Sequence, residues 1–270
     1  MNVAVVGHLE WAKFVCIIHV PVAGEIVQAD DNWEEVAGGG AVAAMQLAKL
    51  NGKCLFFTSI GSDDIGEKAL FQLRESGVEI YASKIANSAT KSVFVDIDSN
   101  KERTITVIGS KVPTALDTTL PWDKLANMDA VYFVSGDKSA LKLARKAKTL
   151  VSTARILPLL QESHIQIDAL VMSQKDKGEE YKEGDLLPKP TYVITTRGVD
   201  GGEVDNGVIY NSEVVPSNKL IDTYGCGDSF AAGLTYGLAQ GFSIEDALSL
   251  GSHCGAEAVM RRGAFGERMD

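Results

Sequence analysis

The alternation of short apolar runs with longer helix-like stretches constrains the fold of this chain more than any other feature. The apolar runs predict buried strands because they are short and end at glycine or polar residues. They are VAVVG (3–7), CLFFTSIG (54–61), VYFVSG (131–136), TLVST (149–153), DALVMS (168–173) and TYVITTRG (191–198). Helical patterns lie between or after them, at about 40–50, 62–77, 138–147, 155–163, 228–239 and 244–261. This order predicts an α/β fold, a parallel sheet with helices on both faces.

Residue types at the ends of the helical stretches support these assignments. Ser62 is expected to cap the second helix, which has acids in its first turn and Gly77 at its end. Gly52 follows the first helix, where glycine commonly ends a helix. The last helix starts with SIED (243–246), which resembles a capping box.

Two segments break the alternation. TKSVFVDIDSNKERTITVIG (90–109) has a period of two on either side of a polar turn, which predicts a hairpin, and CIIHVPVAGEIVQA (16–29) also has an extended pattern. We expect strands from about 10–35 and 88–110 to form a small projecting sheet that acts as a lid. Surface hairpins without a role would show the same pattern. Because no linker or repeat is present, residues 1–270 are expected to form a single domain.

Charge and cysteine usage exclude several classes of function. The formal net charge is −10 at pH 7, which disfavours a nucleic-acid partner because such binding depends on Lys and Arg. The four cysteines form no CxxC pair, which disfavours a zinc site or a disulfide framework. The N-terminus lacks the basic region of a signal peptide, and no run of about 20 apolar residues is present. We therefore expect a cytoplasmic protein without a membrane partner.

Polar and glycine residues follow the predicted strands at their carboxyl ends, where parallel sheets bind ligands. They lie at 7–10, 135–137, 173–176, 196–198 and 222–228. Carboxyl ends of parallel strands share one edge of the sheet, so the sequence predicts the site at that edge.

The segment GCGD (225–228) opens a predicted helix and carries the most specific chemistry. The first amide groups of a helix have no acceptor within the helix and favour an anion, and glycines let that anion approach the backbone. A carboxylate beside such a pocket, Asp228, is suited to removing a proton from a hydroxyl that attacks a bound phosphate. The alternative is that Asp228 only caps the helix.

The wider segment DTYGCGDSF (222–230) resembles the C-terminal motif of the ribokinase-like carbohydrate kinases, the phosphofructokinase-B family. The resemblance extends over nearly the whole chain. It includes AGGGAVAAMQLAKLNG (37–52), FTSIGSDDIGEKALFQLRESGVEI (57–80), TKSVFVDIDSNKERT (90–104), TYVITTRGVDGG (191–202) and AVMRRGAFG (258–266).

The resemblance implies a ribokinase-like three-layer α/β/α fold with a small β-sheet lid. It also implies a kinase that transfers the γ-phosphoryl group of ATP to a hydroxyl of a small sugar or sugar-like molecule, with Asp228 as general base. Magnesium is expected because phosphoryl transfer needs charge neutralisation. The residues implied for the anion hole are Gly225, Cys226 and Gly227, supported by Asp222 and Thr223 near a possible monovalent cation such as K⁺. Those implied for the nucleotide are Thr196, Arg197, Gly198 and Gly201. His253 and Cys254 are expected either beside the adenine or on a buried helix face. Those implied for the substrate are Gly38, Gly39 and Gly40.

The chain departs from the family pattern at several positions. An Asn-x-x-Glu motif tied to magnesium is replaced by SQKD (173–176), which leaves Asp176 as the candidate metal-site acid. Ala43 stands where many members have asparagine. Ala12 stands near the position of a substrate-binding aspartate, and Glu10 is the nearest acid. Trp11 is expected either to stack on a substrate ring or to belong to the lid core.

Other functions remain to be weighed. Gly38–Ala43 satisfies the dinucleotide fingerprint, but that motif requires a hydrophobic strand before it, and DDNWEEVA (30–37) is acidic. The altered 173–176 motif would also suit a catalytically impaired, ligand-binding relative. Within the kinase interpretation, a nucleoside is an alternative acceptor to a sugar. A monomer and a homodimer that pairs through the lid edge are both expected possibilities.

Overall fold

The central sheet has nine strands in the order β13-β12-β11-β10-β9-β8-β1-β4-β5. This computed structural model describes residues 1–109 and 119–266. The parallel strands are β1 (Val3–Val6), β4 (Cys54–Gly61), β5 (Val78–Ile85), β8 (Ala130–Phe133), β9 (Thr149–Thr153), β10 (Ala169–Ser173) and β11 (Tyr192–Thr196). The antiparallel strands are β12 (Gly202–Val204) and β13 (Ile209–Tyr210). The predicted α/β fold is confirmed.

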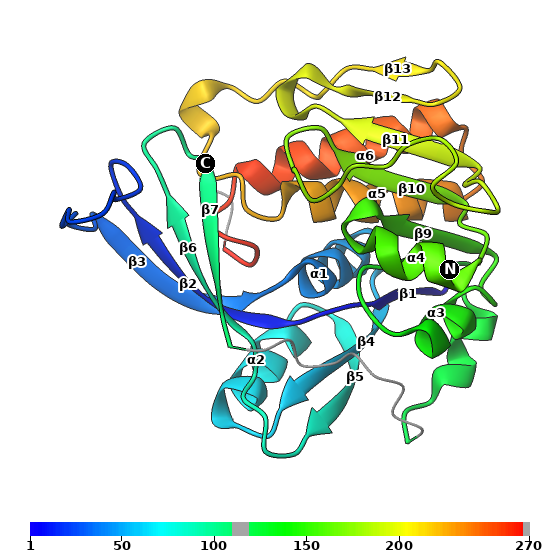
Figure 1. Cartoon of the computed structure of the whole chain (residues 1–270), viewed down its shortest axis with the longest axis horizontal. Helices are drawn as coiled ribbons and strands as arrows, with labels where there is room; N and C mark the ends of the chain where they lie inside the picture. Colours follow the sequence, from blue (N-terminus) through cyan, green and yellow to red (C-terminus); the bar gives the residue numbers. More distant parts are fainter. Residues whose placement is uncertain (110–118, 267–270) are drawn as a thin grey trace.

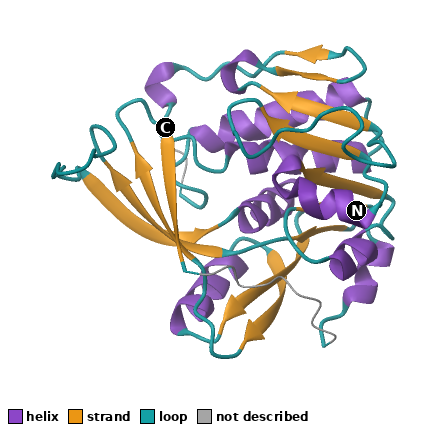
Figure 2. Ribbon diagram, in the orientation of Figure 1, coloured by secondary structure: helices purple, strands orange, loops and turns teal. Residues whose placement is uncertain are grey.

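Helices cover both faces of this sheet (Figure 2). One face packs against α1 (Gly39–Asn51), α2 (Asp64–Arg74), α5 (Cys226–Ala239) and α6 (Ile244–Val259). The other packs against α3 (Lys138–Ala144), α4 (Leu157–Ser163) and the 3-10 turn η1 (Trp122–Asn127). Because both faces are covered, the central strands read as continuous apolar runs: all four residues of β1 and of β8 are buried.

A second, four-stranded sheet projects from the side of the molecule (Figure 1). Its order is β3 (Asp31–Ala37), β2 (Glu10–Cys16), β6 (Ser92–Ile97) and β7 (Arg103–Ile108). The predicted hairpin is β6–β7; residue 110 lies outside the described residues. We call these four strands the small sheet.

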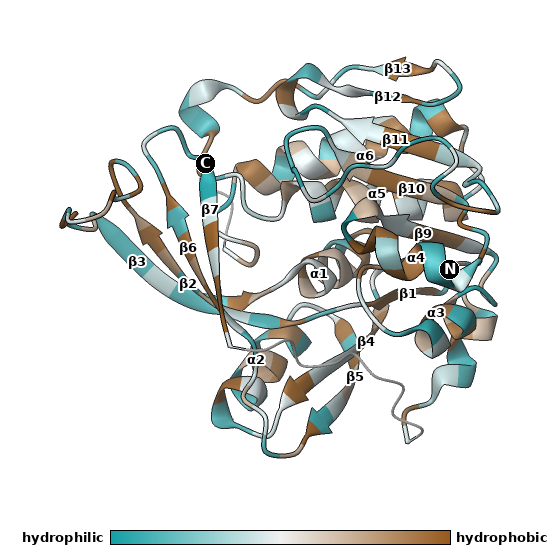
Figure 3. Ribbon diagram, viewed as in Figure 1, coloured by the Kyte–Doolittle hydropathy of each residue, from teal (hydrophilic) through white to brown (hydrophobic). Residues whose placement is uncertain are grey.

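The expectation of extended structure at 16–29 was wrong for most of that segment. Residues 17–30 form the connection between β2 and β3, which pair directly in antiparallel register. Pro21 and Gly24 interrupt any continuation of β2, and Ile26 is fully exposed. The acidic segment before Gly38 is instead a strand, β3, whose hydrophilic outer half is seen in Figure 3. Because β3 belongs to the small sheet, the strand that leads into Gly38–Ala43 is not a strand of the central sheet, as a dinucleotide-binding fold would require.

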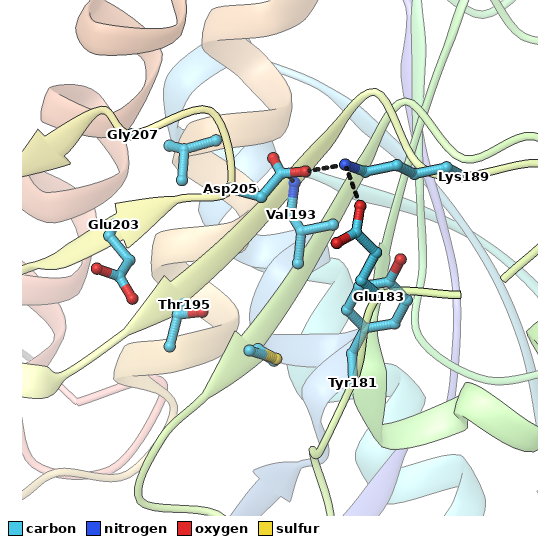
Figure 4. Close-up of a pocket in the computed structure, with 10 residues that line it drawn as sticks. Tyr181, Glu183, Lys189, Val193, Thr195, Glu203, Asp205 and Gly207 are labelled. Carbon is cyan, nitrogen blue, oxygen red and sulfur yellow. Dashed lines mark hydrogen bonds and ion pairs between the residues drawn. The ribbon is translucent and has the colours of Figure 1, made fainter. Parts of the chain in front are cut away.

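The connection between β10 and β11 contains no helix in the described structure. A crossover between adjacent parallel strands usually forms one, but residues 174–191 are rich in charge and form only turns. A cavity of about 450 Å³ lies between this crossover and the sheet. Figure 4 shows its side chains, among them Lys189, which pairs with Asp205 at 2.9 Å and with Glu183 at 3.5 Å.

The caps follow the expectations with one correction. Gly52 has φ +79° and Ser243 accepts from the Asp246 amide, as expected. Asp63, and not Ser62, caps α2: its carboxylate accepts from the Gly66 amide at 3.0 Å and also holds the Thr90 amide at 2.8 Å. No described helix is long and apolar enough to cross a membrane.

Candidate active site

Gly225 is the N-cap of α5. Its φ of +73° is a left-handed conformation that favours glycine. The Asp222 side chain stabilises the turn before α5. Its buried carboxylate accepts hydrogen bonds from the Tyr224 and Gly263 amides, each at 2.8 Å. Desolvation by burial raises the pKa of Asp222, against these two bonds. Asp222 therefore orders the backbone at the start of α5.

The first turn of α5 faces open space. A Cβ added at Gly227 would meet no atom within 4 Å, and Gly227 is exposed. The amide groups of this turn have no acceptor within the helix, and the helix dipole favours an anion there. Burial raises the pKa of the Cys226 thiol, so this side chain stays neutral and does not repel an anion. The structure thus offers room for an anion at the predicted place.

Asp228 lies in the same turn with its side chain 15% exposed. A Cβ at Gly39 would stand 2.6 Å from Asp228 Oδ1, so the carboxylate lies directly against the backbone that begins α1. Arg155 Nη1 lies 3.6 Å from the same oxygen. The carboxylate is therefore aimed at the junction of α5, α1 and β9 and does not cap its helix, whose N-cap is Gly225.

Gly38, Gly39 and Gly40 at the start of α1 were expected to contact substrate, and the structure shows that close packing within the protein also requires glycine there. Side chains at Gly38 and Gly40 would collide with the His8 carbonyl oxygen, at 3.0 and 2.7 Å, and a side chain at Gly39 with Asp228. These glycines therefore let the protein pack closely on itself. They also bring α1 to the turn before α5, because the Gly38 amide donates to the Tyr224 hydroxyl at 2.9 Å.

Glu10 lies beside this loop, buried on the inner face of β2. It forms an ion pair with Lys91, and its Oε1 lies 3.8 Å from His8 Nε2. His8 Nε2 accepts from the Gly39 amide at 3.1 Å, and burial lowers the pKa of this imidazole, so it is neutral. Sequence reasoning placed His8 at the predicted edge, within residues 7–10, but gave it no role, and it missed Lys91.

Trp11 points to the other side of β2. It is 7% exposed, its indole N–H donates to Glu34 at 3.2 Å, and Lys68 of α2 lies over its ring. Of the two expectations for Trp11, the structure supports packing between the small sheet and α2.

Arg155 and Glu179 were also missed. Arg155 Nε donates to Glu179 Oε1 at 2.8 Å, and Glu179 is 4% exposed. Burial lowers the pKa of Arg155, but the charges of Asp228 and Glu179 outweigh it and raise that pKa, so the guanidinium is charged. No periodic pattern marks Glu179, because it lies in the helix-free crossover.

Asp176 adjoins this cluster through its backbone, because the Glu179 amide donates to the Asp176 carbonyl at 3.0 Å. Its carboxylate accepts from the Gly178 amide at 3.1 Å and closes a local turn. No group of three or more potential metal-ligating acids, histidines or cysteines occurs among residues 1–109 and 119–266.

The expected nucleotide loop follows β11 as a tight turn. The Arg197 amide donates to the Gly201 carbonyl at 2.7 Å, and Gly198 and Gly201 have φ of +63° and +74°. Thr196 Oγ1 donates to the Met172 carbonyl at 3.3 Å, and Arg197 pairs with Glu203 at 2.5 Å. The turn brings these groups to the carboxyl end of β11.

His253 and Cys254 separate on α6. His253 is half exposed, pairs with Glu213 at 2.9 Å and lines a cavity of about 460 Å³. Cys254 is 1% exposed, and its thiol contacts Gln46 of α1 and packs where Gly233 leaves space. Of the two expectations for Cys254, the structure supports the buried helix face, in the core between α1, α5 and α6.

The pfkB family of carbohydrate kinases matches this chain over residues 1–175 and 169–267. The chain belongs to the pfkB family. The two matched segments meet at the β10–β11 crossover, where the chain lacks a helix. Membership makes this pfkB protein an ATP-dependent carbohydrate kinase, as the sequence predicted.

Curated relatives of this pfkB kinase cover nearly all of it. It is 21% identical to a ribokinase of Dictyostelium discoideum (97% of this chain, 95% of the relative). It is 26% identical to an ATP-dependent ribose-1-phosphate kinase of Halopiger xanaduensis (96% and 92%) and 23% identical to an adenosine kinase of Saccharomyces cerevisiae (84% and 79%). The pfkB kinase is thus similar to sugar and nucleoside kinases alike.

Solved structures show the same fold. A ribokinase of Thermotoga maritima superposes with a TM-score of 0.78 at 21% identity, covering 98% of this chain and 94% of that one. A ribokinase of Arabidopsis thaliana, complexed with ribose and ATP, gives 0.77 at 20% identity, with 98% and 94% covered. The ribokinase-like fold of the pfkB kinase is confirmed.

A buried acid joins the small sheet to the C-terminal segment of this pfkB kinase. Glu35 of β3 accepts from the Ala264 amide at 2.8 Å, and burial raises the pKa of Glu35 to about 7, with Asp222 adding to the effect. A raised pKa in the folded state means that stability is present below the ordinary pKa of Glu and is lost as the pH rises through about 7.

We expect Glu35→Gln to be more stable than wild type by about 1 to 3 kcal/mol at pH 8 and nearly equal to it at pH 4.5. The glutamine oxygen can still accept the hydrogen bond from the Ala264 amide, and the neutral side chain avoids the free-energy cost of a buried charge. Urea unfolding at both pH values measures the difference. An equal difference at both pH values would show that Glu35 does not titrate in this range.

Proposed function

We propose that this kinase transfers the γ-phosphoryl group of ATP to a hydroxyl of a small sugar or nucleoside, with Asp228 as general base and the Gly225–Gly227 backbone as anion hole. One observation carries the proposal. Asp228 faces the junction of α1, α5 and β9, and the space beside Gly227 in the same helical turn is open. An acid and an anion-binding backbone are thereby placed side by side.

The reaction balances as a direct displacement. The acceptor oxygen forms a bond to the γ-phosphorus, the bond between that phosphorus and the β–γ bridging oxygen breaks, and ADP leaves. Asp228 accepts the hydroxyl proton, and the first-turn amides of α5 stabilise the charge on the phosphoryl oxygens. Glu10, His8 and Lys91 lie on the acceptor side and are proposed to bind hydroxyl groups of the acceptor.

The nucleotide is proposed to lie along Thr196–Gly201 toward His253, at the far side of the α5 N-terminus. Magnesium, when bound with ATP, supplies charge neutralisation on the phosphates. It commonly keeps water ligands and needs few protein carboxylates, which fits a site without a cluster of acids. Asp176 is proposed to reach it through water. Asp222, whose two carboxylate oxygens each accept one backbone bond, keeps lone pairs for a monovalent cation such as K⁺.

The small sheet is proposed to act as a lid. The turn between β6 and β7 reaches the segment before α5: the Thr223 amide donates to the Lys101 carbonyl at 3.1 Å, and Lys175 pairs with Glu102 at 3.8 Å. Inner-face residues of the sheet, Phe14 and Val95, pack in one cluster with Tyr224. Movement of the sheet would therefore be coupled to the turn that orders the anion hole.

We expect acceptor and a non-hydrolysable ATP analogue together to slow tryptic cleavage at Lys101 and Arg103 more than either alone. Closure of the lid would hold the β6–β7 turn against Thr223, and proteases cleave locally opened chain. Mass spectrometry of limited digests measures the two rates. Unchanged rates at both bonds would contradict a lid role.

An ATP-consumption screen over sugars, sugar acids, sugar phosphates and nucleosides tests the proposed reaction. The proposal expects turnover with at least one class and none without acceptor. A catalytically impaired, ligand-binding relative is the second candidate, favoured by the replaced 173–176 motif. It predicts binding without ATP consumption. Sedimentation of the protein would also distinguish a monomer from a dimer formed through the exposed β7 edge.

A further inference from the structure

Arg155 occupies the carboxyl end of β9, on the same side of the sheet as Asp228. The 3-10 turn Ala154–Ile156 places it there, and its side chain is 40% exposed, which is high for a residue so close to buried acids. Its charge also influences His8, on the acceptor side. Arg155 therefore lies where both the base and the acceptor can contact it.

Glu179 fixes the orientation of this arginine. Glu179 Oε1 accepts from Arg155 Nε at 2.8 Å and pairs with Nη2 at 2.6 Å. Glu179 Oε2 accepts from the Ser173 amide at 2.8 Å. Nη1 is left on the opposite edge. Within the described chain Nη1 makes no hydrogen bond, and it lies 3.6 Å from Asp228 Oδ1.

The other cation on the acceptor side is already used. Lys91 pairs with Glu10 and is only 16% exposed, whereas the Arg155 side chain is 40% exposed and therefore accessible to a ligand. A guanidinium whose Nη1 makes no hydrogen bond in the described chain, and faces Asp228 only at 3.6 Å, is suited to bind carboxylate or phosphate oxygens. If Arg155 served only to pair with Glu179, its Nη1 would not need to face Asp228.

We propose that the natural acceptor carries an anionic oxygen group, a carboxylate or a phosphate, that binds Arg155 Nη1 while a hydroxyl of the same molecule contacts Asp228. This inference rests on the proposed function. The positive charge of Arg155 offsets the repulsion between Asp228 and the anionic acceptor, and Glu179 acts as a positioning residue for the guanidinium.

Acceptors with one carbon skeleton and different charge test this inference. Ribose, ribonate and ribose 1-phosphate form one set, and glucose, gluconate and glucose 1-phosphate a second. We expect kcat/KM for the best anionic member to exceed that of its neutral counterpart by about 10- to 100-fold, as for a hydrogen bond to a charged group. The carboxylate and phosphate members distinguish the two sources of charge.

Variants then connect the preference to Arg155. We expect Arg155→Gln to reduce the ratio of kcat/KM for the anionic acceptor to kcat/KM for the neutral one by about 10- to 100-fold, mainly through KM for the anionic acceptor, and Arg155→Lys to recover part of this ratio. Glu179→Gln should weaken the same preference. Arg145→Gln is the matched control, because Arg145 also pairs with an acid, Asp168 at 2.6 Å, in a different cluster. The rise in melting temperature that the anionic acceptor causes gives a readout independent of turnover.

Two results would overturn the inference and leave the kinase function standing. One is a neutral compound as the best acceptor in both sets. The other is an equal loss of kcat for neutral and anionic acceptors in Arg155→Gln, which would place the guanidinium on the transferred phosphoryl group. Absence of phosphorylation with any acceptor in these sets or in the wider screen would instead overturn the proposed function itself.

Discussion

Asp228→Asn is expected to lower kcat by about 10²- to 10⁴-fold while ATP still binds, because asparagine keeps the shape of the side chain and cannot accept the hydroxyl proton. The carboxylate lies against Gly39 and 3.6 Å from Arg155, so the isosteric amide fits without new contacts. Steady-state kinetics and calorimetric titration of ATP measure the two effects separately.

Asp64→Asn is a matched control, since it removes an exposed carboxylate from the first turn of another helix, α2. Its kcat should equal that of wild type. If Asp228→Asn retained more than about a third of wild-type kcat, the base would have to be another group, because a positioned base contributes at least ~10²-fold.

Gly227→Val is expected to reduce kcat by about 10²- to 10³-fold, the effect of losing an oxyanion donor, with a nearly unchanged melting temperature. A Cβ at this position meets nothing within 4 Å, so the fold has room for a side chain. The proposed function places the phosphoryl group in this same open space, and the valine methyl groups would fill it.

Gly225→Ala provides the contrast. Gly225 has φ +73°, and a Cβ there would stand 3.0 Å from Val42, so this substitution should destabilise the fold by about 1 kcal/mol or more. Thermal unfolding and kinetics of both variants separate the two roles. Wild-type kinetics in Gly227→Val would place the phosphate elsewhere.

Patterns that act locally could be read from the sequence. The apolar runs predicted the parallel sheet because both of its faces are covered, and the β6–β7 hairpin followed from its period of two. The GCGD segment indicated the α5 start because glycine chemistry and helix geometry are set within a few residues. β3 lies mostly within the range of about 10–35 where strands were expected, but its bounds could not be read because its outer half is acidic and exposed.

Contacts between distant segments could not be read in the same way. Arg155 and Glu179 are separated by 24 residues, and Glu179 lies in a crossover without periodic structure. Gly40 was expected to admit substrate, but in the structure the backbone of Gly7 and His8, directly after β1, packs against it, and this contact depends on how α1 packs. Trp11 needed its partners, Glu34 and Lys68, to show on which side of β2 it lies.

The helix-free crossover between β10 and β11 has a consequence for how this protein can diverge. A crossover helix must keep an apolar stripe for the sheet, which limits its substitutions, whereas turns at the surface tolerate replacement and changes of length. Glu179 is carried by such a segment. Altered acceptor preference can therefore arise from mutations in this crossover without loss of foldability, and we expect selection for new acceptors to act there first.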